Sequence, residues 1–263
     1  MNNIFLEFAN QMADESAIIA RKYFRNNFFE EIKNDKSPVT IADKEIEKKL
    51  REMISKKFPG HGICGEEYQN VNIESEYQWI IDPIDGTSSF IIGRPTFTTL
   101  ISLIYKKKPI IGIINQPITN ERWVGLDDDS SSSGAWFNGQ EIKTRKCKNI
   151  ENAVISTTSD FFFEKNDLEK FFKIARKAKY QKFGGVVYGA DSYAYGLLSL
   201  GLIDIIIEPK LQIYDYAALI PIIKKSGGYI TKWDGSEPCL QSNIEIVATC
   251  SKDLHEEVLQ ILI

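Results

Sequence analysis

Residues 79–90 of the chain read WIIDPIDGTSSF, an apolar run that ends in two aspartates followed by small hydroxyl residues. The run WII predicts a buried β-strand, and Asp82 and Asp85 follow it with Pro83 stiffening the bend between them. A turn is the simplest explanation, because aspartates at a strand end normally face water. The alternative is a site that holds metal ions on one side and a phosphate on the other.

The residues that follow the strand suit such a site. In the bend both carboxylates and the Ile84 carbonyl can converge, and these are the hard oxygen ligands that Mg²⁺ prefers. The backbone N–H groups of Gly86, Thr87 and Ser88 would open a helix, whose N-terminus attracts anions. The Thr87 hydroxyl can orient a water molecule. Spacing alone leaves the turn and the metal site as open alternatives.

The composition is that of a soluble globular protein, with 43% hydrophobic and 26% charged residues among 263. A net charge of −4 gives no excess of basic residues, so nucleic-acid binding is disfavoured. The four cysteines form no CxxC pair, which favours free thiols in a reducing compartment over a zinc ribbon. No signal peptide is apparent and no apolar run reaches the roughly 18 residues of a membrane helix. We expect a cytoplasmic protein without membrane contact.

Hydrophobic periodicity predicts one unit over 1–263, in which an N-terminal α+β lobe (1–150) and a C-terminal α/β lobe (151–263) share one site. The first lobe should contain helices at 4–24 and 42–57 and strands at 78–82, 97–105, 110–115, 121–126 and 135–137. The second should alternate strands at 153–157, 203–207, 228–231 and 245–248 with helices at 166–177, 190–200, 215–225 and 252–262. The run 127–134 is interpreted as a solvated, mobile hairpin tip.

Motifs of several other chemistries are missing, including the P-loop, the GxGxxG turn and the GxSxG nucleophile elbow. His61 and His255 are interpreted as structural or surface residues, so acid–base chemistry must depend on carboxylates, hydroxyls or water activated by a metal ion. The carboxylates that begin or end a regular element are Asp43, Glu66, Glu67, Asp82, Asp85 and Asp215. Taken alone, Asp43 is better explained as an acidic residue at a helix N-terminus.

The stretch DPIDGTSSF resembles the DPIDGT or DPLDGT signature of the inositol monophosphatase superfamily. Two further motifs occur in the family's order and at its separations, GEE at 65–67 and YDYAA at 214–218, the latter followed by GG at 227–228. The resemblance covers essentially the whole chain. It implies a five-layer αβαβα sandwich and a Mg²⁺-dependent, Li⁺-sensitive phosphomonoesterase with two or three ions per site. It also implies a homodimer.

The resemblance further implies a role for each matching residue. The first metal ion would be bound by Glu66, Asp82 and the Ile84 carbonyl. The second would be bound by Asp82, Asp85 and Asp215. Asp43 and Glu66 would hold the attacking water and a third ion, and Thr87 would orient that water. The phosphate would lie against Asp85, Gly86, Thr87 and Ser88.

The substrate pocket is expected in the second lobe, at positions that match the family's leaving-group pocket: Gly189, Ala190, Asp191 and Glu208. Inositol-cleaving members usually carry a small hydroxyl residue where this chain has Ala190, and Trp-Asp where it has Tyr214-Asp215. The strings YGADSYAY (188–195) and GRPTFTTL (93–100) are instead similar to the histidinol-phosphatase branch. Without the resemblance, Asp191 reads as a helix cap and Glu208 as the end of a buried strand.

The function expected from this branch is hydrolysis of L-histidinol phosphate to L-histidinol and phosphate, in histidine biosynthesis. The substrate carries an ammonium and an imidazole, for which Asp191 and Glu208 would be natural partners. A polyol pocket can also use carboxylates, so an inositol-1-phosphate or broad sugar-phosphate phosphatase remains an alternative. A catalytically inactive, metal-dependent binding protein is a further alternative, but such a protein would have little need for the intact set of carboxylates.

Overall fold

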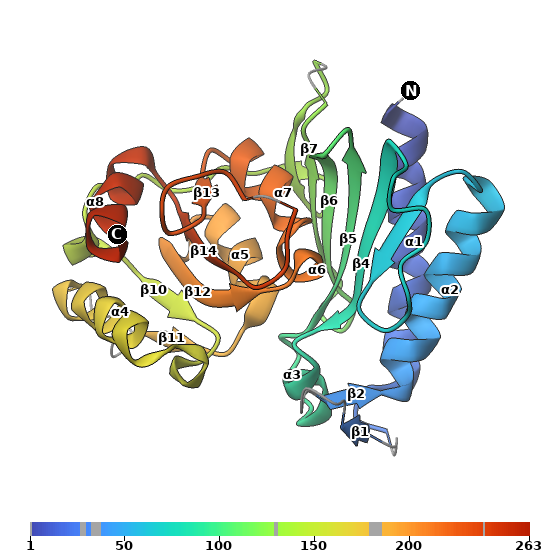
Figure 1. The fold of residues 1–263 in the computed structure, drawn as a ribbon, viewed down its shortest axis with the longest axis horizontal. Helices are drawn as coiled ribbons and strands as arrows, with labels where there is room; N and C mark the ends of the chain where they lie inside the picture. Colours follow the sequence, from blue (N-terminus) through green and yellow to red (C-terminus); the bar gives the residue numbers. More distant parts are fainter. Residues whose placement is uncertain (1, 27–29, 33–37, 129–130, 179–185, 239) are drawn as a thin grey trace.

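The computed structural model describes residues 2–26, 30–32, 38–128, 131–178, 186–238 and 240–263. These residues form two large β-sheets and the helices that cover and separate them (Figure 1). The layers follow in the order helix, sheet, helix, sheet, helix, which confirms the predicted five-layer αβαβα sandwich.

The first sheet has seven strands in sequence order, and all neighbours are antiparallel except the first pair. The strands are β3 (Gly62–Gly65), β4 (Tyr77–Asp85), β5 (Thr98–Tyr105), β6 (Lys108–Gln116), β7 (Glu121–Leu126), β8 (Gly134–Phe137) and β9 (Gln140–Glu141). The second sheet has the order β11-β10-β12-β14-β13. Its strands are β10 (Ile155–Thr157), β11 (Val187–Tyr188), β12 (Ile205–Leu211), β13 (Tyr229–Thr231) and β14 (Ile244–Thr249).

Helices form three layers around these sheets. The outer face of the first sheet is covered by α1 (Asn2–Tyr23) and α2 (Ile41–Lys57). The space between the sheets is filled by α5 (Asp191–Ser199), α6 (Ile213–Tyr216) and α7 (Leu219–Lys225). The outer face of the second sheet is covered by α4 (Lys165–Lys177) and α8 (Lys252–Leu262). Smaller elements are β1 (Glu30–Ile32), β2 (Pro38–Thr40), α3 (Thr87–Ile91), η1 (Ile150–Asn152) and η2 (Asp160–Phe162).

Helix α2 shows how local sequence places the first lobe's core. Ile46, Leu50 and Ile54 recur at a spacing of four, so they share one face, and all three are fully buried. Thr40 caps the helix, because its hydroxyl accepts the N–H groups of the first turn while Asp43 reaches back to the Thr40 backbone. This capping box fixes where α2 begins and therefore where Asp43 lies.

Two predictions from sequence are wrong in detail. The helix expected at 215–225 is two helices, α6 and α7, because Pro221 has no N–H to donate to the preceding turn. The run 127–134 is not solvated at its start: Asp127 is only 9% exposed and forms ion pairs with Lys108 and Lys225. Residues 129–130 of that run lie outside the described residues.

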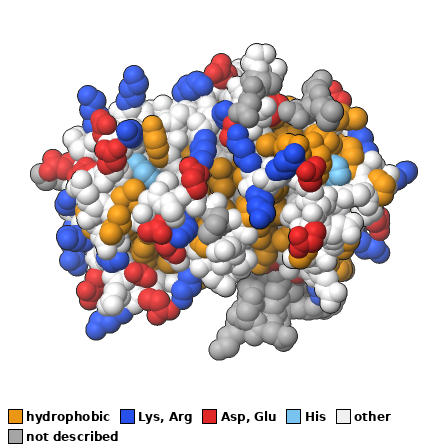
Figure 2. All heavy atoms as spheres, turned by 45° about the horizontal axis from the view of Figure 1, so that its top comes forward, with side chains coloured by type: hydrophobic (Ala, Val, Ile, Leu, Met, Phe, Trp, Pro, Cys, Tyr) orange, Lys and Arg blue, Asp and Glu red, His pale blue; other side chains and the backbone are white. Residues whose placement is uncertain are grey.

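The surface agrees with the modest net charge. Figure 2 shows basic and acidic side chains interspersed over the face that it presents. None of the helices among the described residues is long and apolar enough to cross a membrane. Cys64, Cys147 and Cys250 are free thiols, and Cys239 lies outside the described residues.

His255 is a buried structural residue, as expected, and it ties α8 to the second sheet. The residue is 5% exposed, and its ring has Nε2 at 2.9 Å from the Thr231 hydroxyl and Nδ1 at 3.0 Å from the Thr249 hydroxyl. Burial lowers the pKa of His255 to about 4, because a charged imidazolium would lose its hydration. The neutral ring is therefore part of the folded state.

We predict that His255 makes the fold sensitive to acid. The pKa in the folded state, about 4, is below the unfolded value of 6.5, so the unfolded chain takes up the proton first and stability falls as the pH drops from 6.5 towards 4. Between pH 7 and pH 5 this term should remove about 2 kcal/mol from the free energy of unfolding. Urea denaturation of the wild type and His255→Gln at both pH values measures it. The variant should be less stable at pH 7 and lose less on acidification, whereas parallel losses would contradict the assignment.

Candidate active site

Strand β4 carries Asp82 and Asp85 on either side of a β-bulge, where its pairing with β5 shifts by one residue. Residues three apart in a regular strand point to opposite faces of the sheet, and the extra residue brings both aspartates to the same side. The Thr99 hydroxyl donates to the Pro83 carbonyl over 2.8 Å and holds the bulge in place. The predicted bend is therefore a bulge inside a strand, a position that tolerates proline.

Asp215 completes a group of three carboxylates with Asp82 and Asp85. One oxygen from each lies within 4.8 Å of the others. Asp215 belongs to α6 of the second lobe, where its Oδ2 accepts the Gln212 backbone N–H over 2.7 Å. Asp82 is only 2% exposed, and its Oδ1 has no hydrogen-bond partner within the described part of the chain. The two lobes thus meet at a concentrated negative charge.

The pKa values of these carboxylates reflect the negative charge concentrated there. Burial raises the pKa of Asp82 well above its usual value, and the charges of Glu66, Asp85 and Asp215 raise it further. Burial and then Asp85 raise the pKa of Asp215 in the same way. Burial and then Asp191 raise the pKa of Asp85 to about 7. A divalent cation would turn this repulsion into attraction, so the orphaned oxygen and the carboxylate set fit a bound metal ion.

Asp43 and Thr87 meet on one side of the group. Asp43 is fully buried, and its Oδ2 accepts the Thr40 backbone N–H over 2.8 Å. The Thr87 hydroxyl lies 3.4 Å from Asp43 Oδ1 and 3.0 Å from the Ile84 carbonyl oxygen. Burial raises the pKa of Asp43 to about 7, although the hydrogen bonds from Thr40 oppose the shift. Asp43 therefore caps α2 and also contacts Thr87.

Glu66 follows β3, the parallel neighbour of β4. Gly65 pairs with Ile81, so Glu66 comes next to Asp82. The loop after it is held by Glu47 of α2, which is fully buried and whose Oε2 accepts the Glu67 backbone N–H over 2.7 Å. A side chain at Gly65 would place its Cβ only 2.2 Å from Glu47 Oε1. The glycine is needed because Glu47 occupies that space.

Helix α5 begins against the bulge of β4. Asp85 Oδ2 accepts the Ser192 backbone N–H over 2.7 Å, so Asp85 binds the first turn of α5, whose N-cap residue is Ala190 and not Asp191. A side chain at Gly86, where φ is +82°, would place its Cβ 2.7 Å from Asp191 Oδ2. Arg94 donates to the Gly189 carbonyl over 2.7 Å. The structure therefore places Asp191 against the start of the predicted phosphate loop.

Glu208 lies on β12, buried at 3% exposure. Its Oε1 accepts the Thr158 backbone N–H over 2.6 Å and the Thr158 hydroxyl over 2.9 Å. Burial raises the pKa of Glu208 to about 8, and the charges of Asp191 and Asp85 add to the shift. Of the other predicted residues, Ala190 is buried in the core between the sheets, Gly189 is half-buried and Ser88 is exposed.

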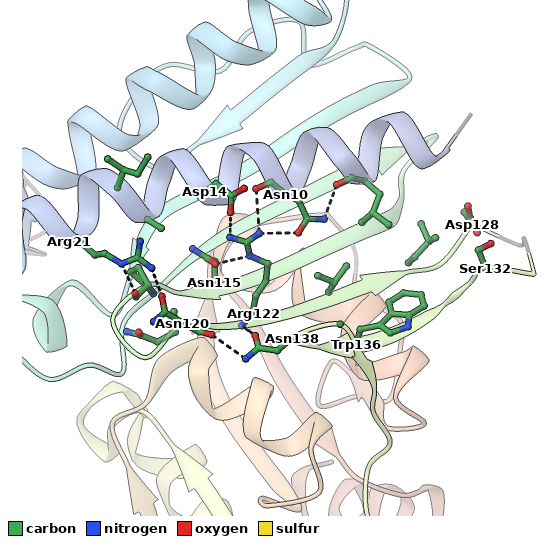
Figure 3. A pocket seen from close by; sticks show the side chains of 18 residues that line it. Asn10, Asp14, Arg21, Asn115, Asn120, Arg122, Asp128, Ser132, Trp136 and Asn138 are labelled. Atoms are coloured by element: carbon green, nitrogen blue, oxygen red, sulfur yellow. Dashed lines mark hydrogen bonds and ion pairs between the residues drawn. The ribbon is translucent and has the colours of Figure 1, made fainter.

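A groove of about 1080 Å³ lies elsewhere, between α1 and the strands β6 to β8 (Figure 3). None of the predicted site residues lines it. Its most enclosed cation, Arg122, already donates to Asn115 Oδ1, Asn10 Oδ1 and Asp14 Oδ1 over 2.8, 3.1 and 2.6 Å. We place the chemistry at the carboxylate group, because the unsatisfied charge is there.

Sequence reasoning did not identify Glu47, Arg51 and Thr40 as supports of the site. Glu47 lies four residues after Asp43, and Arg51 four after Glu47, so the three charged residues share one face of α2. The Arg51 Nε donates to Glu47 Oε1 over 2.7 Å. The signal available in the sequence was the spacing of four between these charged residues, which places them in a row along α2.

The chain is similar to known proteins over almost its whole length. The chain matches the model of the "Inositol monophosphatase family" over residues 1–262. It is 39% identical to a chloroplastic bifunctional phosphatase of Arabidopsis thaliana, covering 98% of this chain and 75% of that protein. It is 30% identical to a histidinol-phosphatase of Chlorobaculum parvum, covering 88% and 87%. An inositol monophosphatase from Zymomonas mobilis superposes with a TM-score of 0.87 at 38% identity, covering 99% and 98%.

Relatives with other names match at similar levels. They include a fructose-1,6-bisphosphatase/inositol-1-monophosphatase of Aquifex aeolicus at 28% identity and an inositol-1-monophosphatase of Caulobacter vibrioides at 31%. The family model extends over nearly the whole chain, and the solved structure shares its fold. The chain therefore belongs to the inositol monophosphatase family, a family of phosphatases.

Proposed function

We propose that the chain is a Mg²⁺-dependent phosphomonoesterase that hydrolyses L-histidinol phosphate. The observation that carries the proposal is the number of buried and half-buried carboxylates at one place. Asp82, Asp85 and Asp215 form the group that suits metal ions, yet Asp191 and Glu208 add two more carboxylates beside it. A substrate that brings its own positive charge would compensate these two.

The position of Asp191 favours an amino alcohol phosphate over a polyol phosphate. Its carboxylate lies against Gly86, at the start of the predicted phosphate loop. In histidinol phosphate the ammonium is on the carbon next to the ester carbon, so it lies close to the phosphate. The charge of Arg94 opposes the effect of burial on the pKa of Asp191 and so favours the ionised carboxylate that an ammonium would bind, while Glu208 would face the imidazole. Inositol 1-phosphate, the alternative substrate, would present only hydroxyl groups to both carboxylates.

The chain's own residues would divide the work as follows. Bound Mg²⁺ would neutralise the phosphate and make water more acidic. Glu66, Asp82, Asp85, Asp215 and the Ile84 carbonyl would hold two or three ions. Asp43 and Thr87 would hold the attacking water, because the Thr87 hydroxyl already contacts Asp43. Gly86, Thr87 and Ser88 would contact the phosphate, and Gly189 with Ala190 would shape the pocket around the alcohol.

The similarity to the inositol monophosphatase family adds three further features to the proposal. They are a homodimer, inhibition by Li⁺ and a cytoplasmic place in histidine biosynthesis. A catalytically inactive binding protein is the competing proposal from another class. The intact carboxylate group speaks against it, because the buried charge of Asp82 is costly to maintain without a use.

The proposal is tested by phosphate release from histidinol phosphate, inositol 1-phosphate and fructose 1,6-bisphosphate at saturating Mg²⁺. We expect the highest kcat/KM on histidinol phosphate. A higher value on inositol 1-phosphate would replace the proposed substrate by the alternative. Mg²⁺ binding without release from any ester would support the inactive binding protein instead.

We predict that Asp85→Asn weakens Mg²⁺ binding and lowers turnover by about 100-fold or more, because it removes charge from a metal ligand. The amide oxygen can still accept the Ser192 N–H, so the fold should persist. Calorimetric Mg²⁺ titration and steady-state kinetics provide the two readouts. Asp14→Asn is the matched control, since Asp14 is an exposed carboxylate in the remote groove. Wild-type turnover in Asp85→Asn would reject the metal assignment.

We predict that Asp191→Asn acts selectively on the cationic substrate. Loss of one charge-assisted hydrogen bond should lower kcat/KM on histidinol phosphate by roughly 10- to 150-fold. Glycerol 2-phosphate, which carries no cation, should lose far less. Asparagine tolerates the positive φ of 43° at this position, so the backbone need not change. Equal losses on the two esters would leave Asp191 with a structural role only.

A further inference from the structure

Arg94 is an exposed arginine of the first lobe that contacts the second lobe beside the candidate active site. It comes three residues after α3, the helix that begins in the predicted phosphate loop. Its Nη2 donates to the Gly189 carbonyl oxygen over 2.7 Å. A side chain at Gly189 would bring its Cβ within 3.0 Å of Arg94 Nη1, so the guanidinium lies directly against this glycine. Arg94 therefore contacts the turn that leads into the predicted leaving-group pocket.

This turn has a backbone that needs support. Gly189 has a φ of +71° and Asp191 a φ of +43°. A residue other than glycine persists in the left-handed region only where its surroundings hold it. Two backbone hydrogen bonds hold the ends of the turn: the Gly189 N–H donates to the Thr157 carbonyl over 3.1 Å, and the Ser192 N–H donates to β4 over 2.7 Å. Arg94 adds a contact between them, at the peptide carbonyl that precedes Ala190.

Arg94 is itself held in the first lobe. Its backbone N–H donates to the Ser89 carbonyl over 2.8 Å, which ties it to α3. The Arg25 guanidinium, from the end of α1, donates to the Gly93 carbonyl over 2.7 Å and 3.0 Å. The turn from which the Arg94 side chain extends is therefore fixed on both sides, and its contact with Gly189 links the position of the second-lobe turn to that of α3.

The contacts close a ring between the two lobes. Within the chain, Gly86 comes directly before α3, and α3 leads to Arg94. Between the lobes, Arg94 contacts Gly189, and two residues later Asp191 returns to the starting point, because a Cβ at Gly86 would lie 2.7 Å from Asp191 Oδ2. Asp191 is half-buried and Arg94 is exposed, so removing the Arg94 side chain opens the ring without disturbing the core.

We propose that Arg94 is a positioning residue for the leaving-group pocket, which holds the turn from Gly189 to Asp191 so that the Asp191 carboxylate faces the alcohol part of the substrate. The inference rests on the proposed function, in which Asp191 binds the ammonium of the substrate. Arg94 touches no reacting atom and acts through Asp191. Without its contact the left-handed residue can relax, and the carboxylate moves away from the phosphate loop. The metal ligands and the phosphate contacts stay in place.

Arg94→Gln tests this role on two esters at saturating Mg²⁺. KM for histidinol phosphate should rise about 5- to 20-fold while kcat changes by about threefold or less, because the lost interaction serves binding of the alcohol part. Glycerol 2-phosphate offers Asp191 no cation, so its kcat/KM should change by about threefold or less. Arg94→Lys should recover most of the affinity, because a lysine ammonium can also donate to the Gly189 carbonyl.

A double-mutant cycle on histidinol phosphate separates action through Asp191 from a general structural effect. In the Asp191→Asn background, Arg94→Gln should cost about twofold or less, since the carboxylate that it positions is gone. Arg176→Gln is the matched control. Arg176 is an exposed arginine of α4 whose guanidinium lies 6.0 Å from the centre of the Phe172 ring, and its substitution should leave turnover of both esters unchanged.

Additive losses in the cycle, equal losses on the two esters, or a lysine variant as impaired as the glutamine variant would each overturn the role of Arg94. A wild type that prefers inositol 1-phosphate to histidinol phosphate would instead reject the proposed substrate. The cycle is then run on inositol 1-phosphate, whose hydroxyl groups would meet the same Asp191 carboxylate. Coupling between Arg94 and Asp191 on that ester supports the positioning role, and additivity overturns it.

Discussion

The repulsion among Asp82, Asp85 and Asp215 is the interaction around which the rest of the structure is arranged. Buried like charges cost several kcal/mol per ion unless something compensates them. Three of the carboxylates at the site receive partial compensation from a backbone N–H at the start of a helix. Asp43 has the N–H of Thr40, Asp85 that of Ser192 and Asp215 that of Gln212. Among the described residues Asp82 has no such donor on its Oδ1, and it would therefore depend most on a cation.

The same repulsion explains the role of several residues outside the group of Asp82, Asp85 and Asp215. The bulge in β4 turns Asp82 and Asp85 to one side, and Thr99 holds the bulge. Glu47 fixes the loop after Glu66 from behind, with Gly65 leaving room for it. These contacts are parts of the site. The carboxylates repel one another, so each must be held in position by contacts with other residues.

Much of this architecture could be predicted from sequence, because local patterns encode it. The apolar run before Asp82 is a strand, the capped and periodic segment after Thr40 is α2, and the alternation beyond residue 150 is the second α/β lobe. The bulge in β4 and the ion pairs of Asp127 could not be predicted in the same way. They depend on partners distant in the sequence, such as β5 for Asp82 and Lys225 for Asp127.

The contact between Asp85 and the Ser192 N–H joins groups that are 107 residues apart, and Asp215 is supplied later still in the chain. During synthesis, the first lobe emerges with two aspartates side by side and without the third. A cation that needs all three oxygens gains nothing from such a nascent chain and binds tightly only after the second lobe has docked. Ligand binding would then stabilise finished molecules selectively, so that cellular metal supply acts on the survival of completed chains and not on the early steps of their folding.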